Sequence, residues 1–350
     1  MKRRWVRWLP AVAVPVAIAA GAIVAPLAAG AADLPSKTPD EVLKLVAGSE
    51  TRSFSGTVEQ SSHLGLPSIP SLGSGSGASP SEQSAASTLA LLTGDHTAKV
   101  YADGPTRLRV QVLDQLAERD AIRNGTDLWL YESTGKKVTH ATVPAHAAES
   151  TPDATATTPS ALAQRFLAAV DPTTEVSLGA DTTVAGRDAY DLVLTPRTAA
   201  TLIGSVSIAV DGTTGLPLRV LVDARGQSTP AFDVGFSSFD PSTPAASVFA
   251  FTPPAGAAVT EQSVPKAEGT RTSPSHPKPT ITGTGWNTIV SLPAGSAPAD
   301  LASSPLYGQL TTTVDGGRAF STSLLSVLIT DDGRVFAGAV PVAALQAAAR

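Results

Sequence analysis

Residues 205–226 read SVSIAVDGTTGLPLRVLVDARG, and this stretch decides the fold. Val206, Ile208 and Val210 alternate with small or polar residues, and Val220 continues the alternation after a turn that contains Gly215. Apolar residues at every second position are typical of a strand with one buried face, and Gly-containing turns join such strands into hairpins. The stretch therefore predicts an antiparallel hairpin with one apolar face.

The same pattern continues on both sides of this hairpin. DAYDLVLTPR precedes it and AFDVGFSSFD follows it, and both alternate with period two. Earlier in the chain, turns at Asp103-Gly104 and Asn124-Gly125 connect further alternating segments, and Asn-Gly is a strong hairpin signal. Near the C-terminus, Gly333 follows two aspartates in one more predicted hairpin turn. The chain is therefore expected to be mainly β.

Two short helices interrupt the strands. Thr38 and Glu41 have the spacing of a capping box, with Pro39 at the first helical position. Thr158 before Pro159 predicts the start of a second helix. A sheet of about ten strands spaced about 4.8 Å apart is about 45–50 Å wide, and a helix covers about 10 Å of it. The helices therefore cover only part of an apolar face. To keep the rest of this face from water, the sheet is expected to close into a filled barrel or sandwich, or to curl around a space for a ligand.

Composition excludes several kinds of chemistry. The 350 residues contain no cysteine, so disulfides and thiolate sites are absent, and the net charge of −5 argues against a nucleic-acid partner. The sequence contains no motif for a nucleophile, a phosphate loop or a metal site, so we expect no catalytic residues, no cofactor and no metal. The five histidines do not have the spacing of metal ligands; they are His63, His96, His140, His146 and His276.

The chain divides into four predicted parts. Residues 1–32 have a basic start, a long apolar run and a small-x-small site, which predict a cleaved signal peptide in preference to an N-terminal membrane anchor. The protein is therefore expected outside the cytoplasm, either secreted or held at the outer face of the cytoplasmic membrane. Residues 33–262 form the predicted main domain, with a flexible Gly/Ser/Pro insertion at 65–90. A Pro-rich connector at 263–280 leads to a C-terminal extension at 281–350, which is expected to add strands and a helix to the same domain.

Five stretches, taken in order, resemble the LolA-like lipoprotein-carrier family. They are SFSGTVEQ, RNGTDLWLYE, DAYDLVLTPR, the hairpin at 205–226, and FAFTPPAGAAV. The layout with its inserted loop is similar to that of actinobacterial LolA-like proteins. In this comparison Phe249 and Phe251 belong to a closing strand that ends at Pro253-Pro254.

The resemblance implies a curled antiparallel half-barrel with short helices as a lid over a hydrophobic concave face. Parity along the strands places one set of apolar residues inward, and the same residues would equally form an ordinary core. The predicted cavity residues are Phe54, Val58, Val100, Leu108, Val110, Leu128, Leu130, Leu192, Leu194, Val206, Ile208, Val210, Val220, Phe232 and Phe236. The predicted lid residues are Val42, Leu45, Leu162 and Phe166.

Two functions follow from the resemblance. The first is a non-catalytic extracytoplasmic protein that buries acyl chains of lipids or lipoproteins in its cavity. The alternative is an RseB-like regulatory module that binds an anti-sigma factor or another membrane protein in envelope stress sensing.

Overall fold

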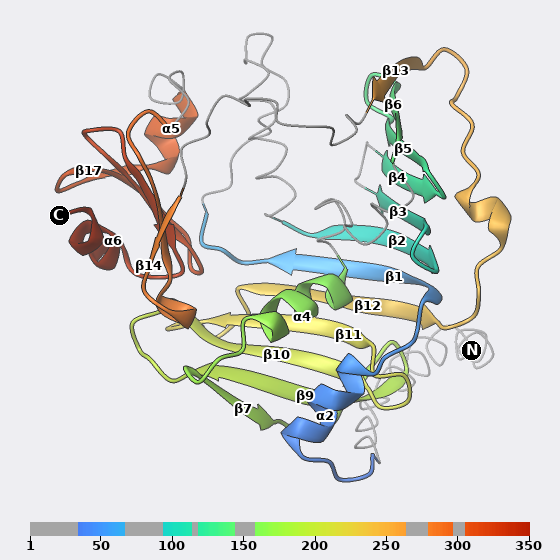
Figure 1. Ribbon diagram of the computed structural model, residues 1–350, viewed down its shortest axis with the longest axis horizontal. Coiled ribbons are helices and arrows are strands. Elements are labelled where there is room, and N and C mark those ends of the chain that lie inside the picture. The colour runs from blue at the N-terminus through green and yellow to red at the C-terminus, as the bar shows by residue number, and fades with distance from the viewer. Residues whose placement is uncertain (1–33, 67–93, 114–117, 144–157, 264–278, 297–304) are drawn as a thin grey trace, which may run out of the picture.

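The alternating stretches of the sequence form the strands of two β-sheets (Figure 1). The computed structural model describes residues 34–66, 94–113, 118–143, 158–263, 279–296 and 305–350. The predicted signal or anchor segment lies outside the described residues, as do most of the 65–90 insertion and most of the 263–280 connector. His146 and His276 lie outside them too.

Within the described residues the larger sheet has thirteen strands, in the order β13-β6-β5-β4-β3-β2-β1-β12-β11-β10-β9-β7, with β8 paired to β9. Their bounds are β1 (Ser53–Ser62), β2 (His96–Asp103), β3 (Arg107–Leu113), β4 (Glu118–Asn124), β5 (Asp127–Glu132), β6 (Lys137–Thr142), β7 (Thr174–Leu178), β8 (Thr182–Val184), β9 (Arg187–Pro196), β10 (Ile203–Asp211), β11 (Pro217–Ala224), β12 (Phe232–Asp240) and β13 (Ala258–Ser263). Neighbouring strands are antiparallel, except that β13 runs parallel to β6. This mainly β, curled sheet confirms the predicted fold class, with more strands than the ten or so expected.

The predicted hairpins form where the turn residues indicated. In β10 and β11, Val206 lies opposite Val222 and Ile208 opposite Val220. Gly215 in their turn has φ +72°, and a Cβ at this position would collide with the carbonyl oxygen of Leu45. Glycine is therefore needed there both for its backbone conformation and for the close approach of the turn to the N-terminal helix. The Asn-Gly turn between β4 and β5 likewise has a left-handed glycine.

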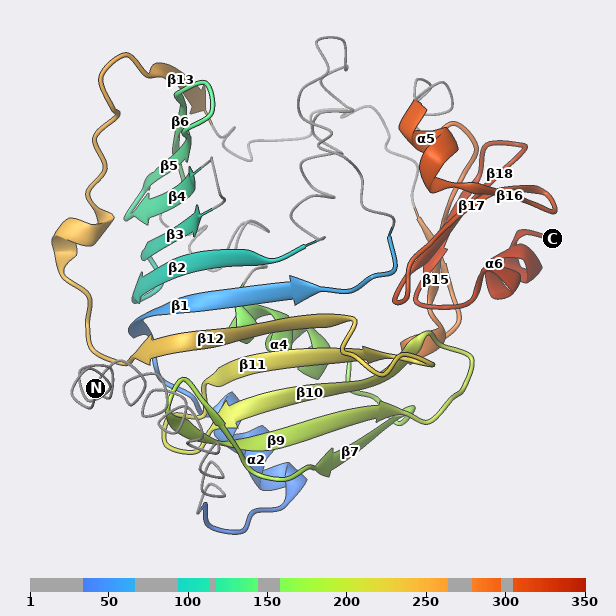
Figure 2. The ribbon, with the colours of Figure 1, turned by 180° about the vertical axis from the view of Figure 1, so that it is seen from behind.

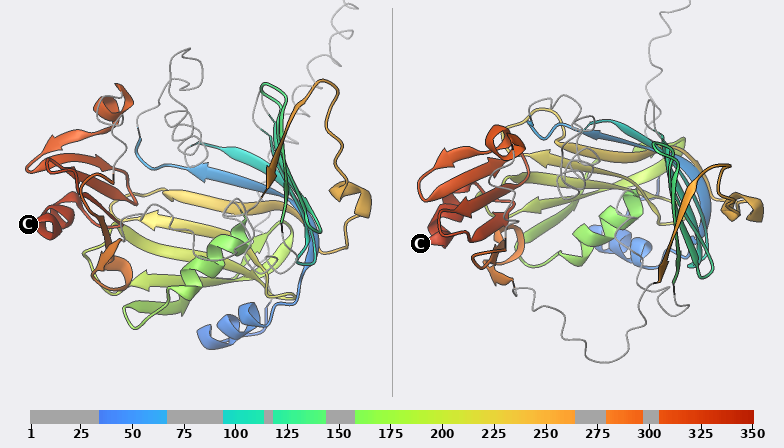
Figure 3. Two further views of the ribbon diagram at one scale, coloured as in Figure 1. Left: turned by 45° about the horizontal axis from the view of Figure 1, so that its top comes forward. Right: turned by 90° about the horizontal axis from the view of Figure 1, so that it is seen from above.

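The larger sheet bends, so that it has two parts with different orientations (Figures 1 and 3). Strands β1 and β7 to β12 form a broad floor, which we call the base. Strands β2 to β6 with β13 rise from one side of the base, and we call them the arm. The concave face is the face of the sheet on the inner side of this bend.

Two helices lie on the concave face of the base (Figure 3). Helix α2 (Pro39–Ala47) begins with the predicted capping box, in which the Thr38 amide donates to Glu41 Oε2 at 2.7 Å. Helix α4 (Pro159–Ala168) begins at Thr158, whose Oγ1 accepts from the Ala161 amide at 3.2 Å. Helix α4 contacts β11 and β12, whereas α2 contacts β7 and β9. Both predicted helices are confirmed.

The predicted closing strand around Phe249 and Phe251 is wrong. Residues 246–249 form a short 3-10 helix, η3 (Ala246–Phe249), and the chain then crosses the outer face of the arm before it pairs as β13 (Figure 2). The physical reason is that the aromatic side chains pack on the outer face of the arm, and this packing does not require β-sheet hydrogen bonds. Phe249 is 1% exposed, and the Phe251 ring lies 5.5 Å from that of Trp129. We call residues 246–251 the strap.

The C-terminal residues form a second, six-stranded sheet within the described part of the chain, in the order β14-β15-β19-β18-β17-β16. Its elements are β14 (Thr280–Thr282), η4 (Gly285–Asn287), β15 (Ile289–Leu292), α5 (Pro305–Leu310), β16 (Thr312–Val314), β17 (Gly317–Ser321), β18 (Ser326–Thr330), β19 (Val335–Gly338) and α6 (Val342–Ala349). Leu345 of α6 packs with Leu328 and Phe336 in a core of its own. The sheet meets the base where the Leu202 amide donates to the Ala339 carbonyl at 2.8 Å. The predicted division of the chain into parts stays a prediction.

Candidate binding face of the curled sheet

Strand register places all fifteen predicted cavity residues on the concave face. In the base, two rows of directly opposite residues are Leu192–Ile208–Val220–Val234 and Leu194–Val206–Val222–Phe232, and Val210 lies opposite Tyr190 in the next row. In the arm, two rows are Val100–Val110–Ala121–Leu130 and Ala102–Leu108–Arg123–Leu128. Strand β1 joins the two parts, because Val58 lies opposite both Phe236 and Ala98, and Phe54 lies opposite Ala102. Lipid binding by these residues stays a prediction.

The concave face of the base is covered by protein. Leu192, Leu194, Val206, Ile208, Val210 and Val220 are all 0% exposed. Val42 of α2 and Ala163 of α4 belong to the same buried cluster, and the predicted lid residues Leu45, Leu162 and Phe166 are half-buried against it. This half of the face is therefore a closely packed core beneath two helices.

The concave face of the arm is covered less completely. Val100 and Val110 are buried in the main cluster, but Leu128 is only half-buried and Leu130 is 41% exposed. Leu128 and Leu130 are also absent from the main core cluster, which contains residues of β1 to β3 and of the base. A large apolar side chain with this exposure on a concave surface is available for contact with a ligand.

Arg123 is a residue of this face that the sequence analysis missed. It lies between Leu108 and Leu128 in the arm and is 5% exposed. Its Nε donates to the Gly125 carbonyl at 3.2 Å, whereas Nη1 and Nη2 have no hydrogen-bond partner in the part of the chain that the structure describes. The sequence does indicate that Arg123 faces inward. It stands two residues after Ala121 and therefore lies on the same face of the strand, and Leu128 and Leu130 share this face across the Asn-Gly turn.

The outer face of the arm is buried beneath the strap. Ile122 and Val138, which point outward, are 0% and 1% exposed. Arg109 holds the strap in place, because its Nη1 donates to the Val248 carbonyl at 3.0 Å while Nε and Nη2 bind Asp120 at 3.1 and 2.5 Å. Burial raises the pKa of Asp120 above its ordinary value, although Arg109 acts in the opposite direction. This polar cluster holds the backbone of the strap, with Asp120 buried and Arg109 partly exposed.

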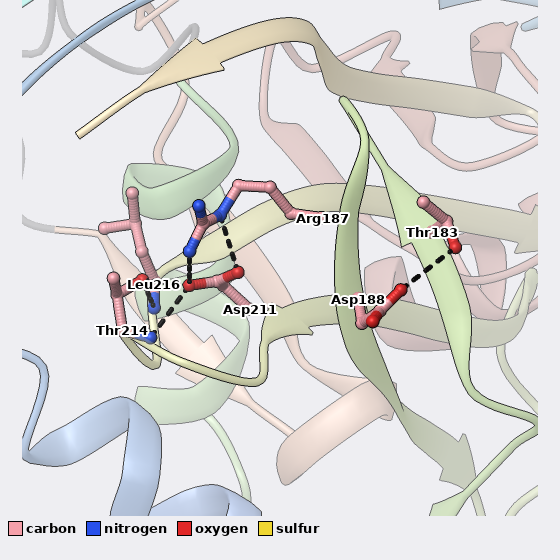
Figure 4. A network of polar contacts seen from close by, with 6 residues as sticks. All are labelled: Thr183, Arg187, Asp188, Asp211, Thr214 and Leu216. Carbon is pink, nitrogen blue, oxygen red and sulfur yellow. Dashed lines mark hydrogen bonds and ion pairs between the residues drawn. The ribbon is translucent and has the colours of Figure 1, made fainter. Parts of the chain in front are cut away.

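A second buried ion pair fixes the β10–β11 turn next to α2 (Figure 4). Arg187 Nε and Nη2 donate to the two carboxylate oxygens of Asp211, both at 2.8 Å, and the Thr214 amide donates to Asp211 at 2.8 Å. Burial raises the pKa of Asp211, but the hydrogen bonds from Arg187 and Thr214 outweigh it, so the net pKa is lowered. All the charges are paired, which is the arrangement of a structural ion pair.

Two further polar clusters among the described residues occupy structural positions. His140 binds Asp127 at 3.0 Å and Glu261 at 2.8 Å, which joins β6 to β5 and β13. In the C-terminal sheet, Asp332 accepts from Arg334 Nε at 2.8 Å in the turn that the sequence predicted. The described part of the chain has no group of three or more His, Asp or Glu side chains that could hold a metal ion.

The fold and the site define a class: an open, curled antiparallel sheet whose apolar concave face is partly covered by short helices. The chain belongs to the family described as "Predicted periplasmic protein (DUF2092)", which matches residues 81–261. This membership agrees with the predicted location outside the cytoplasm. Among the described residues, no helix is both long and apolar enough to cross a membrane.

Distant likenesses extend to several solved structures. The MucA/MucB complex of Pseudomonas aeruginosa matches with 18% identity and a TM-score of 0.42, over 88% of this chain and 96% of that one. An uncharacterized conserved protein from Thermus thermophilus matches with 13% identity and a TM-score of 0.35, over 64% and 98%. A LolA superfamily protein from Nitrosomonas europaea matches with 11% identity and a TM-score of 0.26, over 62% and 99%. LolA-like proteins are the group that the sequence motifs resemble. No curated protein matches the chain.

Proposed function

We propose that the protein is a non-catalytic binding protein of the cell envelope, which holds the acyl chains of a lipid or lipoprotein against its concave face. The observation that carries this proposal is the uneven cover of that face. The two helices cover the base, while Leu128 and Leu130 continue the apolar rows into the arm outside the packed core. An acyl chain placed along these rows would remove exposed apolar surface from water.

The energetics favour a chain-like ligand. Each buried CH₂ contributes about 0.8 kcal/mol, so ten methylenes contribute about 8 kcal/mol before the costs of ordering the ligand. Among the described residues, the buried polar clusters at Arg109 and Arg187 are internally paired and serve packing. Binding an acyl chain by burying it against apolar side chains therefore requires no catalytic or metal-binding group.

A bulky substitution on the concave face of the arm tests the proposal. Leu130→Trp fills the exposed part of the apolar row, and Leu325→Trp is its matched control, because Leu325 is equally exposed, at 42%, in the β17–β18 turn. We expect L130W to weaken binding of a fluorescent fatty acid about tenfold, equivalent to about 1.4 kcal/mol, with thermal stability and L325W binding unchanged. Lipid mass spectrometry of protein purified from its own host gives the independent readout. Absence of lipid, together with no binding of the fluorescent probe, would overturn the proposal.

A second candidate function is binding of a membrane protein, such as an anti-sigma factor, and one observation favours it. Strand β14 lies at the end of the second sheet, and its Ile281 is 66% exposed opposite Val290, which is 38% exposed. Exposed apolar residues on a terminal strand are suited to pairing with a strand from a partner protein.

This candidate predicts a different pattern of mutational effects. The double variant Ile281→Lys/Val290→Lys should lose capture of a single-span protein from membranes, while L130W retains it. The opposite pattern, or capture that neither variant changes, would contradict the second candidate.

A further inference from the structure

Arg123 lies among apolar residues on the concave face of the arm, and the charged residues Arg119, Glu132 and Lys137 form a separate row of that face, beyond Leu130. Its row on the concave face contains Ala102, Leu108 and Leu128, and the adjacent row contains Ala121 and Leu130. Rows two residues apart along a strand lie about 7 Å from one another. The guanidinium thus shares the concave face with the most exposed apolar side chain of that adjacent row, Leu130.

Among the described residues, the end of the Arg123 side chain is buried without a counter-charge. Within that part of the chain Nε alone has a partner, the Gly125 carbonyl, and the residue is 5% exposed to solvent. Guanidinium is always charged at physiological pH, and a buried charge without hydrogen bonds is costly. Nη1 and Nη2 therefore lack, among the described residues, the partners that a buried guanidinium requires.

Other arginines of the sheet differ in this respect. Arg109, Arg187 and Arg219 each bind both oxygens of an aspartate, and in each case the pair is formed within the chain. The register gives Arg123 two leucines as its cross-strand neighbours instead. An amphiphilic partner from outside the chain would supply both the counter-charge for the guanidinium and apolar contacts for the leucines.

We propose that Arg123 receives the anionic head of an acyl amphiphile, with two oxygens of a carboxylate or phosphate on Nη1 and Nη2 and the acyl chain along Leu128 and Leu130. This inference rests on the proposed function and narrows its ligand to amphiphiles with a negative head. The planar guanidinium matches two anionic oxygens at once, which a single point charge does not.

The test compares probes of the same chain length and different head charge. Oleate and 1-oleoyl lysophosphatidate carry the anion, 1-monoolein is neutral, and inorganic phosphate is the anion alone. Binding is measured below the micelle concentration by displacement of a neutral fluorescent probe. We expect the full protein to prefer the anionic amphiphiles over monoolein by about tenfold or more, in line with a hydrogen bond to a charged group.

Three variants make the test specific. Arg123→Met keeps the length and removes the charge, so it should abolish the preference for anions and leave monoolein binding intact. Arg123→Lys keeps the charge without the planar fork and should retain part of the preference. Arg107→Met is the matched control, because it removes a positive charge from the opposite face of β3 and should preserve the preference.

The outcomes separate this inference from the proposed function. Equal binding of oleate and monoolein, or an R123M protein that still prefers anions, overturns the inference and leaves acyl-chain binding in place. Loss of the preference in R107M to the same extent also overturns it, because the effect is then long-range. Tight binding of inorganic phosphate without any preference for amphiphiles overturns the inference in favour of a site for a free anion. Loss of a protein partner in R123M, with amphiphile binding unchanged, overturns it in favour of a protein-binding role for Arg123. Failure of every amphiphile overturns both proposals.

Discussion

In the base, concave residues such as Ile208 are covered by α2 and α4, whereas in β4 and β5 of the arm the outward Ile122 is fully covered beneath the strap and the inward Leu130 is 41% exposed. The strands of the two parts alternate in the same way, and they belong to one sheet. The difference teaches that alternation specifies an apolar face, while the segment that covers it comes from elsewhere in the chain. The inner face of β5, where Leu130 is 41% exposed, is the part of the arm that we propose for a ligand.

Removing the anchor of the strap should produce the largest effect. Phe249 is 1% exposed, and truncation of a buried Phe costs about 3–5 kcal/mol. We expect Phe249→Ala to lower the free energy of unfolding by about 4 kcal/mol and to accelerate amide exchange in β3 to β5 more than in β9 to β11. The half-buried Phe251→Ala should cost less. Equal acceleration of amide exchange in the base and the arm would mean that the strap does not stabilise the arm more than the base.

The concave face itself offers a direct comparison between its two parts. Ile208 is 0% exposed beneath the helices, so Ile208→Ala should cost about 3 kcal/mol, as expected for a cavity in a packed core. Leu130 is 41% exposed, so Leu130→Ala should cost under about 1 kcal/mol. Urea unfolding of both variants measures the difference. Similar costs at the two positions would show that the arm is packed as tightly as the base.

Much of the fold followed from local signals in the sequence. Thr38 and Thr158 marked the helix starts, and the glycines at 104, 125 and 333 marked turns, because each of these signals depends on neighbours within a few residues. The parity of the concave face followed for the same reason, since the side-chain period of a strand is two.

The remainder depended on long-range contacts. The aromatic pair Phe249 and Phe251 has the pattern of a strand, but its partner surface is the outer face of the arm rather than a neighbouring ladder. The inward parity of Arg123 could be read from the sequence, but parity alone does not separate a buried arginine from a solvated one. Its burial distinguishes it, together with the lack of a partner for Nη1 and Nη2 within the described ranges of the chain.

The contribution of two ion pairs of the base to stability should increase with their burial. Asp211→Ala leaves Arg187 without its partner at a position where Asp211 is 1% exposed, so we expect a loss of about 2–3 kcal/mol. Asp233→Ala breaks the half-exposed pair with Arg219 and should cost under about 1 kcal/mol. Thermal unfolding compares the two variants. A larger effect at Asp233 would contradict the view that the turn next to α2 is held by its buried pair.

The smallest expected effect is a pH dependence at the edge of the arm. His140 stacks on Trp129 with ring centroids 3.9 Å apart and joins β6 to Glu261 of β13. Partial burial lowers the pKa of His140, but the hydrogen bonds to Asp127 and Glu261 outweigh it and raise the net pKa. A raised pKa in the folded state means that protonated His140 stabilises the fold. This contribution is full below the ordinary histidine pKa of about 6.5 and is lost as the pH rises through the raised value.

His140→Gln should therefore be less stable than the unmodified protein at acidic pH and should approach it at alkaline pH. Glu261→Gln should weaken the same pH dependence, because it removes one of the two carboxylates that raise the pKa of His140. Amide exchange of β13, measured from about pH 5.5 to 8.5 with correction for intrinsic rates, should locate the change at the edge of the arm and leave the base strands unaffected. A pH dependence that persists in His140→Gln would assign it to other groups, and one that spreads to β9 and β10 would mean that the edge of the arm and the base respond as one unit.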